Sequence, residues 1–174
     1  MTSEQLCKSV RLILTDVDGV LTDGGIIFDN QGIELKKFHV RDGLGIKLWQ
    51  RTGNSFGILT ARTSHIVQVR ARELGIDLVR QGFEDKLPAA REILQQASLS
   101  PEQVCYIGDD LTDLPVIKMV GVGVAVADAV DEVREQADIV LRKGGGQGAI
   151  RETIETILKA QQRWDSLIQR YLTS

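Results

Sequence analysis

The sequence predicts an α/β fold, in which a Rossmann-like, mostly parallel sheet carries helices on both faces and a β-hairpin is inserted. Short apolar runs bounded by Gly and Asp recur along the chain, as expected for buried parallel strands; they lie at residues 10–14, 55–59, 104–107, 122–126 and 139–141. Segments with helical spacing alternate with these runs, at residues 43–51, 64–74, 85–97, 114–119 and 130–136. This alternation is typical of a sheet covered by helices on both sides.

Two further segments complete the predicted fold. Residues 26–28 and 33–38 are separated by Asp-Asn-Gln-Gly, which predicts a hairpin inserted at about residues 25–39. The last predicted helix spans about residues 148–171 and places Ile150, Ile154 and Ile157 along one side. We expect the glycine-rich run at residues 144–148 to be a flexible connection, because it lacks the Lys-Ser/Thr ending of a phosphate-binding P-loop.

Composition limits the class of protein. The 174 residues are 43% hydrophobic and 26% charged, so we expect one globular domain over residues 1–174. No apolar run reaches the roughly 20 residues that cross a bilayer, and no secretory signal is visible, so we expect a cytoplasmic protein without a membrane partner. The net charge of −3 offers no broad basic surface, so we expect no nucleic-acid partner.

Acidic residues follow two of the predicted strands. Asp16 and Asp18 come after the first, and Asp109, Asp110 and Asp113 come after the third. Ligands of open α/β sheets bind at the carboxyl ends of strands, and carboxylates crowded there are unfavourable unless a cation separates their charges. The sequence therefore predicts a site for a hard divalent ion such as Mg²⁺ at this edge.

Two more residues complete this candidate site. Thr60 ends the second strand and offers a hydroxyl, while Lys86 begins a helix and offers a cation. Taken singly, Thr60 could be a helix cap, Lys86 a surface charge and the acidic residues a loop. Their order along the chain favours a shared site that binds a metal ion and a phosphate group.

The ordered set resembles the four motifs of the haloacid dehalogenase superfamily. The resemblance implies that Asp16 is the nucleophile and Asp18 the general acid and base, and that Asp16, Asp109 and the backbone carbonyl of Asp18 bind Mg²⁺. It further implies that Thr60 and Lys86 hold the phosphoryl group. Asp110 and Asp113 are expected to hold metal-bound waters or to position Lys86.

The chain has no room for the cap domain that covers many such sites. Only a hairpin, a helix and a strand fit between Asp23 and Thr60, and one helix with a short extended segment fits between Thr60 and Lys86. The hairpin and the stretches at residues 39–46, 108–116, 124–129 and 145–152 resemble the capless 3-deoxy-D-manno-octulosonate 8-phosphate phosphatases. That resemblance implies a homotetramer assembled through the hairpin, in which neighbouring subunits complete each site.

A sugar-acid phosphate carries a carboxylate as well as a phosphate and needs further cations, since arginine can grip a carboxylate with two hydrogen bonds. The residues expected to contact it, besides Asp18 and Lys86, are His39, Val40, Arg41, Asp42, Gly43, Lys47, Arg62 and Arg70. Asp42 is also a candidate helix cap, and Arg41 leads into a helix expected to begin near Asp42.

Alternatives remain open at this level. Sialic-acid-type 9-phosphate phosphatases share much of the same pattern, so a sialic-acid-type 9-phosphate is an alternative substrate. Relatives commonly have Gly where this chain has Ala61, which leaves the sugar specificity open. A phospho-accepting signalling domain or a non-catalytic assembly module would be proteins of another class. The intact set of Asp16, Asp18, Lys86 and Asp109 favours the phosphatase.

Overall fold

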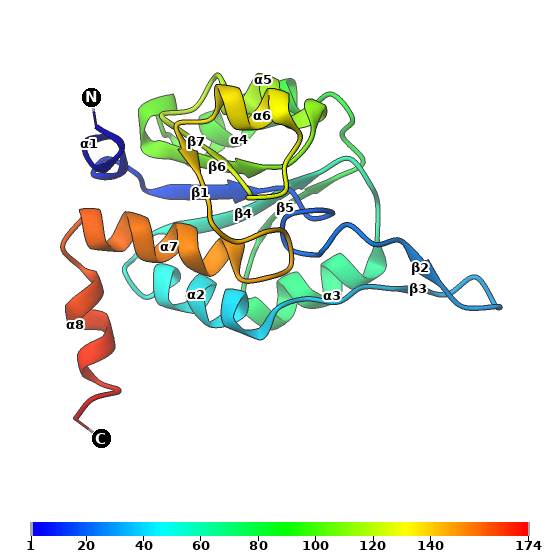
Figure 1. Cartoon of the computed structure of the whole chain (residues 1–174), viewed down its shortest axis with the longest axis horizontal. Helices are drawn as coiled ribbons and strands as arrows, with labels where there is room; N and C mark the ends of the chain where they lie inside the picture. The colour runs from blue at the N-terminus through cyan, green and yellow to red at the C-terminus, as the bar shows by residue number, and fades with distance from the viewer. Residues whose placement is uncertain (1, 174) are drawn as a thin grey trace.

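The computed structural model of the protein describes residues 2–173 and is built on one parallel sheet (Figure 1). Its six strands lie in the order β5-β4-β1-β6-β7-β8, and all neighbours are parallel. They are β1 (Leu12–Thr15), β4 (Ser55–Thr60), β5 (Leu78–Gln81), β6 (Val104–Gly108), β7 (Val122–Ala125) and β8 (Ile139–Val140). The fold class is therefore confirmed, and each apolar run predicted as a strand forms one.

Helices cover both faces of this sheet (Figure 1). On one face lie α2 (Val40–Gln50), α3 (His65–Leu74) and α7 (Ala149–Ala160), and on the other α4 (Lys86–Ala97), α5 (Leu114–Ile117) and α6 (Asp131–Gln136). The short 3-10 helices η1 (Pro101–Gln103) and η2 (Leu111–Asp113) flank β6. Among the described residues no helix is long and apolar enough to span a membrane.

Two elements of the structure have only a weak signal in the sequence. The short segment expected between Thr60 and Lys86 is the edge strand β5, whose polar second half hides its strand character. Helix α1 (Ser3–Cys7) was not predicted, although Thr2 and Gln5 form a capping box at its start. Helix α2 begins at Val40 rather than near Asp42, because the imidazole of His39 caps it.

The predicted hairpin is present and projects from the body (Figure 1). Strands β2 (Ile27–Phe28) and β3 (Glu34–Leu35) pair antiparallel, and the turn between them is closed by the bond from Asp29 N to Ile33 O. Its large apolar side chains face solvent: Ile26, Ile27, Phe28, Ile33 and Leu35 are 46–56% exposed.

The prediction of one C-terminal helix over residues 148–171 is wrong. The chain forms α7 and a separate α8 (Trp164–Gln169), because Gln162 adopts a left-handed conformation with φ of 56°. Arg163 N bonds to Leu158 O and Gln162 N to Lys159 O, which is the Schellman arrangement that ends many helices. Glycine usually occupies the left-handed position, so the Gln at this site concealed the break.

The side chain of Asp42 joins α2 to α7. Its Oδ1 accepts a hydrogen bond of 2.8 Å from Arg151 N in the first turn of α7, where the N-cap residue Gly148 has no side chain to offer. Its Oδ2 is buried without a partner. Burial raises the pKa of Asp42 from 3.8 to about 6, against the opposing effect of the Arg151 N–H.

We predict that Asp42 makes the folding stability depend on pH. Because its pKa is raised in the folded state, its contribution is present in full below about pH 4 and is lost as the pH rises through about 6. The quantity to measure, in metal-free protein, is the free energy of unfolding of the wild type minus that of Asp42→Asn. This difference should fall by on the order of 2 kcal/mol between pH 4 and pH 7. Urea unfolding across this range measures it.

The matched control is Asp165→Asn, which changes an exposed carboxylate on α8. Its stability should follow that of the wild type at every pH. Parallel pH profiles for wild type and Asp42→Asn would contradict the role given to the buried carboxylate.

Candidate active site

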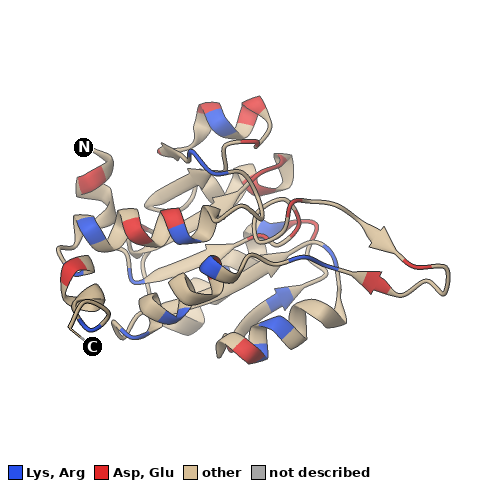
Figure 2. Cartoon of the chain, turned by 60° about the horizontal axis from the view of Figure 1, so that its bottom comes forward, with Lys and Arg blue, Asp and Glu red and all other residues tan. Residues whose placement is uncertain are grey.

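The candidate site lies at the carboxyl edge of the sheet, where its inner strands end together. Asp16 directly follows β1, Thr60 ends β4, and Asp109 follows β6. Because β1 pairs with both β4 and β6, these positions are brought to adjacent places along one edge. Figure 2 shows acidic residues gathered in the loops at this end, whereas acidic and basic residues are mixed along the helices.

The buried ammonium of Lys86 links the acidic residues. Its Nζ lies 2.7 Å from Asp16 Oδ2 and 2.6 Å from Asp113 Oδ1, and its side chain is fully buried at the start of α4. Burial alone would lower the pKa of Lys86, but the two carboxylates outweigh it and raise the pKa. Lys86 is therefore a fixed cation beside Asp16, as the sequence predicted.

Asp113 is the residue that positions Lys86. Besides Lys86, it accepts hydrogen bonds from Tyr106 Oη at 2.6 Å, Asp109 N at 2.9 Å and Asp110 N at 3.2 Å. The Asp110 side chain instead accepts from Leu111 N and caps η2. Tyr106 was not predicted as a site residue, because in an apolar strand it is indistinguishable from a core residue.

Three carboxylates of this site crowd together. Oxygen atoms of Asp16, Asp109 and Asp113 lie within 4.8 Å of one another. Burial, followed by the charges of Asp113 and Asp16, raises the pKa of Asp109 to about 8. Burial and the Asp113 charge also raise the pKa of Asp16, although Lys86 opposes them. The single ammonium group of Lys86 therefore does not balance the negative charge of the three carboxylates.

This donor set fits a hard divalent cation. Asp109 Oδ1 is buried and has no hydrogen-bond partner, so a ligand atom is left free in the cluster. Asp113 already accepts bonds at both oxygens. Asp16 and Asp109 are therefore the side chains that would hold the ion, with Asp113 in support.

Glycines make the close packing around Asp109 possible. A Cβ on Gly19, which has φ of 92°, would lie 2.0 Å from Asp109 Oδ2, and one on Gly145 would lie 1.9 Å from Gly19 O. Gly146 N bonds to Val20 O, and Gly145 N to Asp128 Oδ1. The expectation that residues 144–148 are merely a flexible connection is therefore wrong: the run is packed and bonded against the loop after Asp16.

Asp18 faces the base of the hairpin. Its Oδ1 accepts from Lys36 Nζ in a short ion pair, and Arg62 Nε lies 3.6 Å from its Oδ2. Glu34 accepts from both cations and from Ser64 Oγ. Lys36 and Glu34 were not predicted, since a strand of alternating charges gives no sign of which side chain turns inward.

Other residues expected to bind substrate have structural partners. His39 caps α2 by accepting from Arg41 N, and Asp42 accepts from Arg151 N, as described above. A Cβ on Gly43 would lie 2.5 Å from Arg70 Nη2, so this glycine allows α2 and α3 to pack. Val40 is 79% exposed, and Arg41 is also exposed.

Within one chain, two predicted cations lie outside the carboxylate cluster. Arg70 pairs with Glu73 at 2.7 Å and lines a cavity with Lys36, Phe38 and Val40. Lys47 lines another cavity with Arg51 and Arg72. None of the residues that line the cavity of Lys47 belongs to the carboxylate cluster of Asp16, Asp109 and Asp113.

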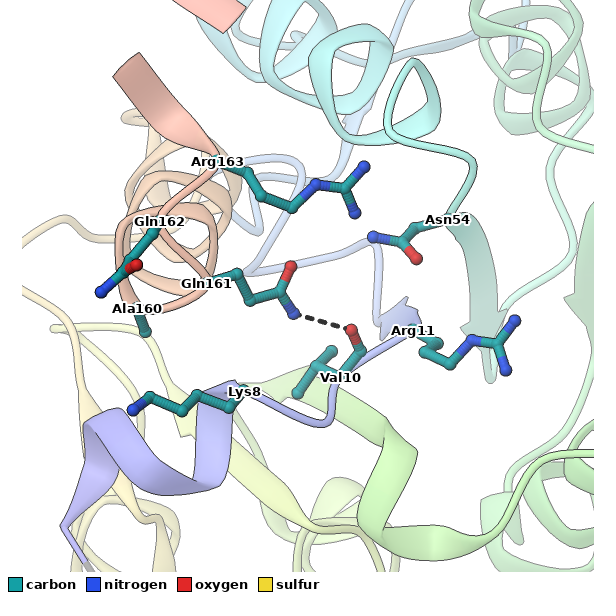
Figure 3. Close-up of a pocket in the computed structure, with 8 residues that line it drawn as sticks. All are labelled: Lys8, Val10, Arg11, Asn54, Ala160, Gln161, Gln162 and Arg163. Carbon is teal, nitrogen blue, oxygen red and sulfur yellow. Dashed lines mark hydrogen bonds between the residues drawn. The ribbon is translucent and has the colours of Figure 1, made fainter. Parts of the chain in front are cut away.

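A further hollow lies where α7 breaks from α8 (Figure 3). Gln161 Nε2 donates to Val10 O at 2.9 Å there, and Arg163 bonds to Thr52 O. Lys8 and Arg11 extend from it in opposite directions (Figure 3). Its cations do not converge, so it is not a second anion site.

The fold and the acidic edge define a hydrolase of the haloacid dehalogenase type, and the haloacid dehalogenase-like hydrolase family matches residues 68–152. The 3-deoxy-D-manno-octulosonate 8-phosphate phosphatase of Yersinia pestis is 46% identical over 159 residues, which cover 91% of this chain and 85% of the relative. That of Escherichia coli K12 is 44% identical over 158 residues, covering 91% and 84%. The chain belongs to the 3-deoxy-D-manno-octulosonate 8-phosphate phosphatase family.

Solved structures agree with this assignment. The Yersinia pestis enzyme superposes with a TM-score of 0.92 at 45% identity, covering 94% of this chain and 88% of that one. The Moraxella catarrhalis enzyme superposes with a TM-score of 0.95 at 40% identity, covering 97% of each chain. The Moraxella structure holds a magnesium ion, a phosphate ion and a KDO molecule.

We predict that Mg²⁺ binding releases a proton near pH 7. The raised pKa of Asp109, about 8, means that this carboxyl is largely protonated in the metal-free protein, and a ligand must be ionised. Calorimetric titration in buffers of different ionisation enthalpy should give a release of roughly one proton at pH 7 that fades above pH 9.

Asp109→Asn should weaken Mg²⁺ binding at least about tenfold and remove the released proton. Asp110→Asn is the matched control, because Asp110 caps η2 rather than joining the cluster. Proton release that is unchanged in Asp109→Asn would show that another group titrates.

Proposed function

We propose that the protein is a Mg²⁺-dependent phosphatase that hydrolyses 3-deoxy-D-manno-octulosonate 8-phosphate to the free sugar acid and phosphate through phosphorylated Asp16. The observation that carries the proposal is the buried contact of Lys86 with Asp16 beside the unpartnered oxygen of Asp109. The substrate follows from the relatives, which act on that phosphate by name and are 44–46% identical over most of the chain.

Asp16 is the proposed nucleophile. One oxygen attacks phosphorus in line, an Asp16–phosphorus bond forms, and the bond from phosphorus to the sugar oxygen breaks. Val17 N donates to Asp16 Oδ1 at 2.6 Å and Lys86 to Oδ2, so the carboxylate is held in one orientation before attack.

Asp18 is the proposed general acid and base. It gives its proton to the departing sugar oxygen, and its carboxylate then takes a proton from the water that attacks the phosphorylated Asp16. Phosphate leaves, and both aspartates return to their starting states. Asp18 is two residues beyond Asp16 and 16% exposed in its side chain, which suits a group that meets both sugar and water.

Thr60 and Lys86 are proposed to hold the phosphoryl oxygens. Thr60 is 2% exposed at the end of β4, next to β1, and Lys86 is the fixed cation beside Asp16. The Mg²⁺ ion, held by Asp16, Asp109 and the carbonyl of Asp18, would neutralise charge on the same oxygens. Asp113 keeps Lys86 in place.

The sugar-acid carboxylate is proposed to meet the cations around the hairpin base, first Arg62, whose side chain is 42% exposed beside Asp18. His39, Arg41 and Arg70 lie on neighbouring elements, and Lys47 would be presented by another copy. The exposed apolar side chains of the hairpin support assembly into a homotetramer that closes each site. We place the enzyme in the cytoplasm.

Asp16→Asn should abolish turnover, with a loss of at least about 10⁴-fold, because the amide cannot form the phosphoryl bond. Phosphate release with Mg²⁺ and 3-deoxy-D-manno-octulosonate 8-phosphate measures it. Asp23→Asn is the control, since Asp23 pairs with Lys37 at the surface and should keep near wild-type activity. Substantial activity in Asp16→Asn would refute the nucleophile.

The same assay tests the substrate and the class of protein. A sialic-acid-type 9-phosphate that is hydrolysed with the higher kcat/KM would favour the alternative substrate. A stable phosphoprotein after treatment with a phosphodonor would instead indicate a signalling domain, because a phosphatase hydrolyses this intermediate quickly.

Phe28→Asp should dissociate the assembly. Phe28 is 56% exposed at the hairpin, and a buried charge at an apolar contact costs several kcal/mol. Light scattering should show a tetramer for the wild type and smaller species for the variant. Val140→Asp, at a 46% exposed position on β8, is the control and should leave the mass unchanged.

A further inference from the structure

The lysine at the base of the hairpin is buried, although the hairpin itself is exposed. The Lys36 side chain is 1% exposed, whereas that of the next residue, Lys37, is 71% exposed. Removing an ammonium group from water is unfavourable unless its partners compensate. The burial of Lys36 is therefore to be explained by the groups that it contacts.

Those groups hold Asp18 on both sides. Lys36 Nζ contacts Asp18 Oδ1 and lies 3.3 Å from Glu34 Oε1. On the other side, Arg62 Nε lies 3.6 Å from Asp18 Oδ2, and its Nη2 lies 3.0 Å from Glu34 Oε1. Asp18, Glu34 and the two cations form a closed ring, which we call the hairpin clamp.

The hairpin clamp is anchored to the body of the protein. Ser64, the residue before α3, donates to Glu34 Oε2 at 2.6 Å. This bond, and then Lys36 and Arg62, lower the pKa of Glu34, so Glu34 stays ionised and holds both cations. The loop after β4 and the hairpin thus fix Asp18 between them.

We infer that Lys36 is a positioning residue that holds the Asp18 carboxyl where it can protonate the leaving sugar oxygen. The inference rests on the proposed function and assigns Lys36 no contact with the reacting atoms. A general acid must lie within hydrogen-bond reach of the oxygen that it protonates, and a displacement of about 1 Å can cost on the order of 100-fold in rate.

Substrates with different leaving groups distinguish whether Lys36 positions the acid or only stabilises the fold. An alkyl sugar phosphate needs a proton as its oxygen departs, whereas the p-nitrophenolate of p-nitrophenyl phosphate departs without one. The ratio kcat/KM reports the steps up to that departure and does not depend on the later hydrolysis of the intermediate. Loss of the acid should therefore lower kcat/KM for the alkyl phosphate alone.

The experiment compares Lys36→Met, Lys36→Arg and the adjacent control Lys37→Met, each with saturating Mg²⁺. Lys36→Met should lower kcat/KM for 3-deoxy-D-manno-octulosonate 8-phosphate at least about tenfold, but that for p-nitrophenyl phosphate less than about threefold. Lys36→Arg should recover part of the loss, and Lys37→Met should match the wild type. Circular dichroism and thermal unfolding confirm that each variant is folded.

Glu34→Gln provides a second route if Lys36→Met does not fold, because it loosens the hairpin clamp while keeping Lys36 and Asp18. It should show the same selective loss to a smaller degree. Equal losses on both substrates, or a gain in activity, in a folded variant would overturn the inference alone. A wild-type protein that hydrolyses neither substrate would overturn the proposed function and this inference with it.

Discussion

The arrangement at the carboxyl edge depends on one buried ammonium group placed between two carboxylates. Lys86 has no exposed side-chain surface and contacts both Asp16 and Asp113, so the desolvation of three charges is offset within one compact group. Removing any partner would leave a buried charge without compensation. The strand ends, the start of α4 and the turn of η2 are held together by this contact, and the orientation of Asp16 follows from it.

The same edge carries more negative charge than Lys86 can balance. Asp109 keeps a buried oxygen without a partner, and its pKa is raised to about 8 by burial and by its acidic neighbours. Such a site favours cation binding, because the fold orients the carboxylates before the ion arrives. Preorganisation of this kind connects the folding of the sheet with the chemistry at its edge.

The hairpin serves two surfaces at once. Its apolar side chains, such as Leu35, face solvent, while the next residue, Lys36, turns inward to Asp18. Successive side chains of a strand point to opposite faces, so a short strand can present both. The proposed assembly surface and the contacts of the proposed acid are thereby joined in one element.

The sequence by itself determined the parallel sheet and the position of Asp16, Thr60 and Asp109 at its carboxyl edge, because apolar runs that end in polar residues report both strands and their carboxyl ends. Only the tertiary structure decided the contacts of Tyr106, Glu34 and Lys36, since their partners are distant in sequence and their burial is not encoded in local pattern. It also made Asp42 a link between α2 and α7, and it divided the C-terminal helix at Gln162. Local sequence records periodicity and hydrophobicity, whereas which charges meet inside the protein depends on the packing of whole elements.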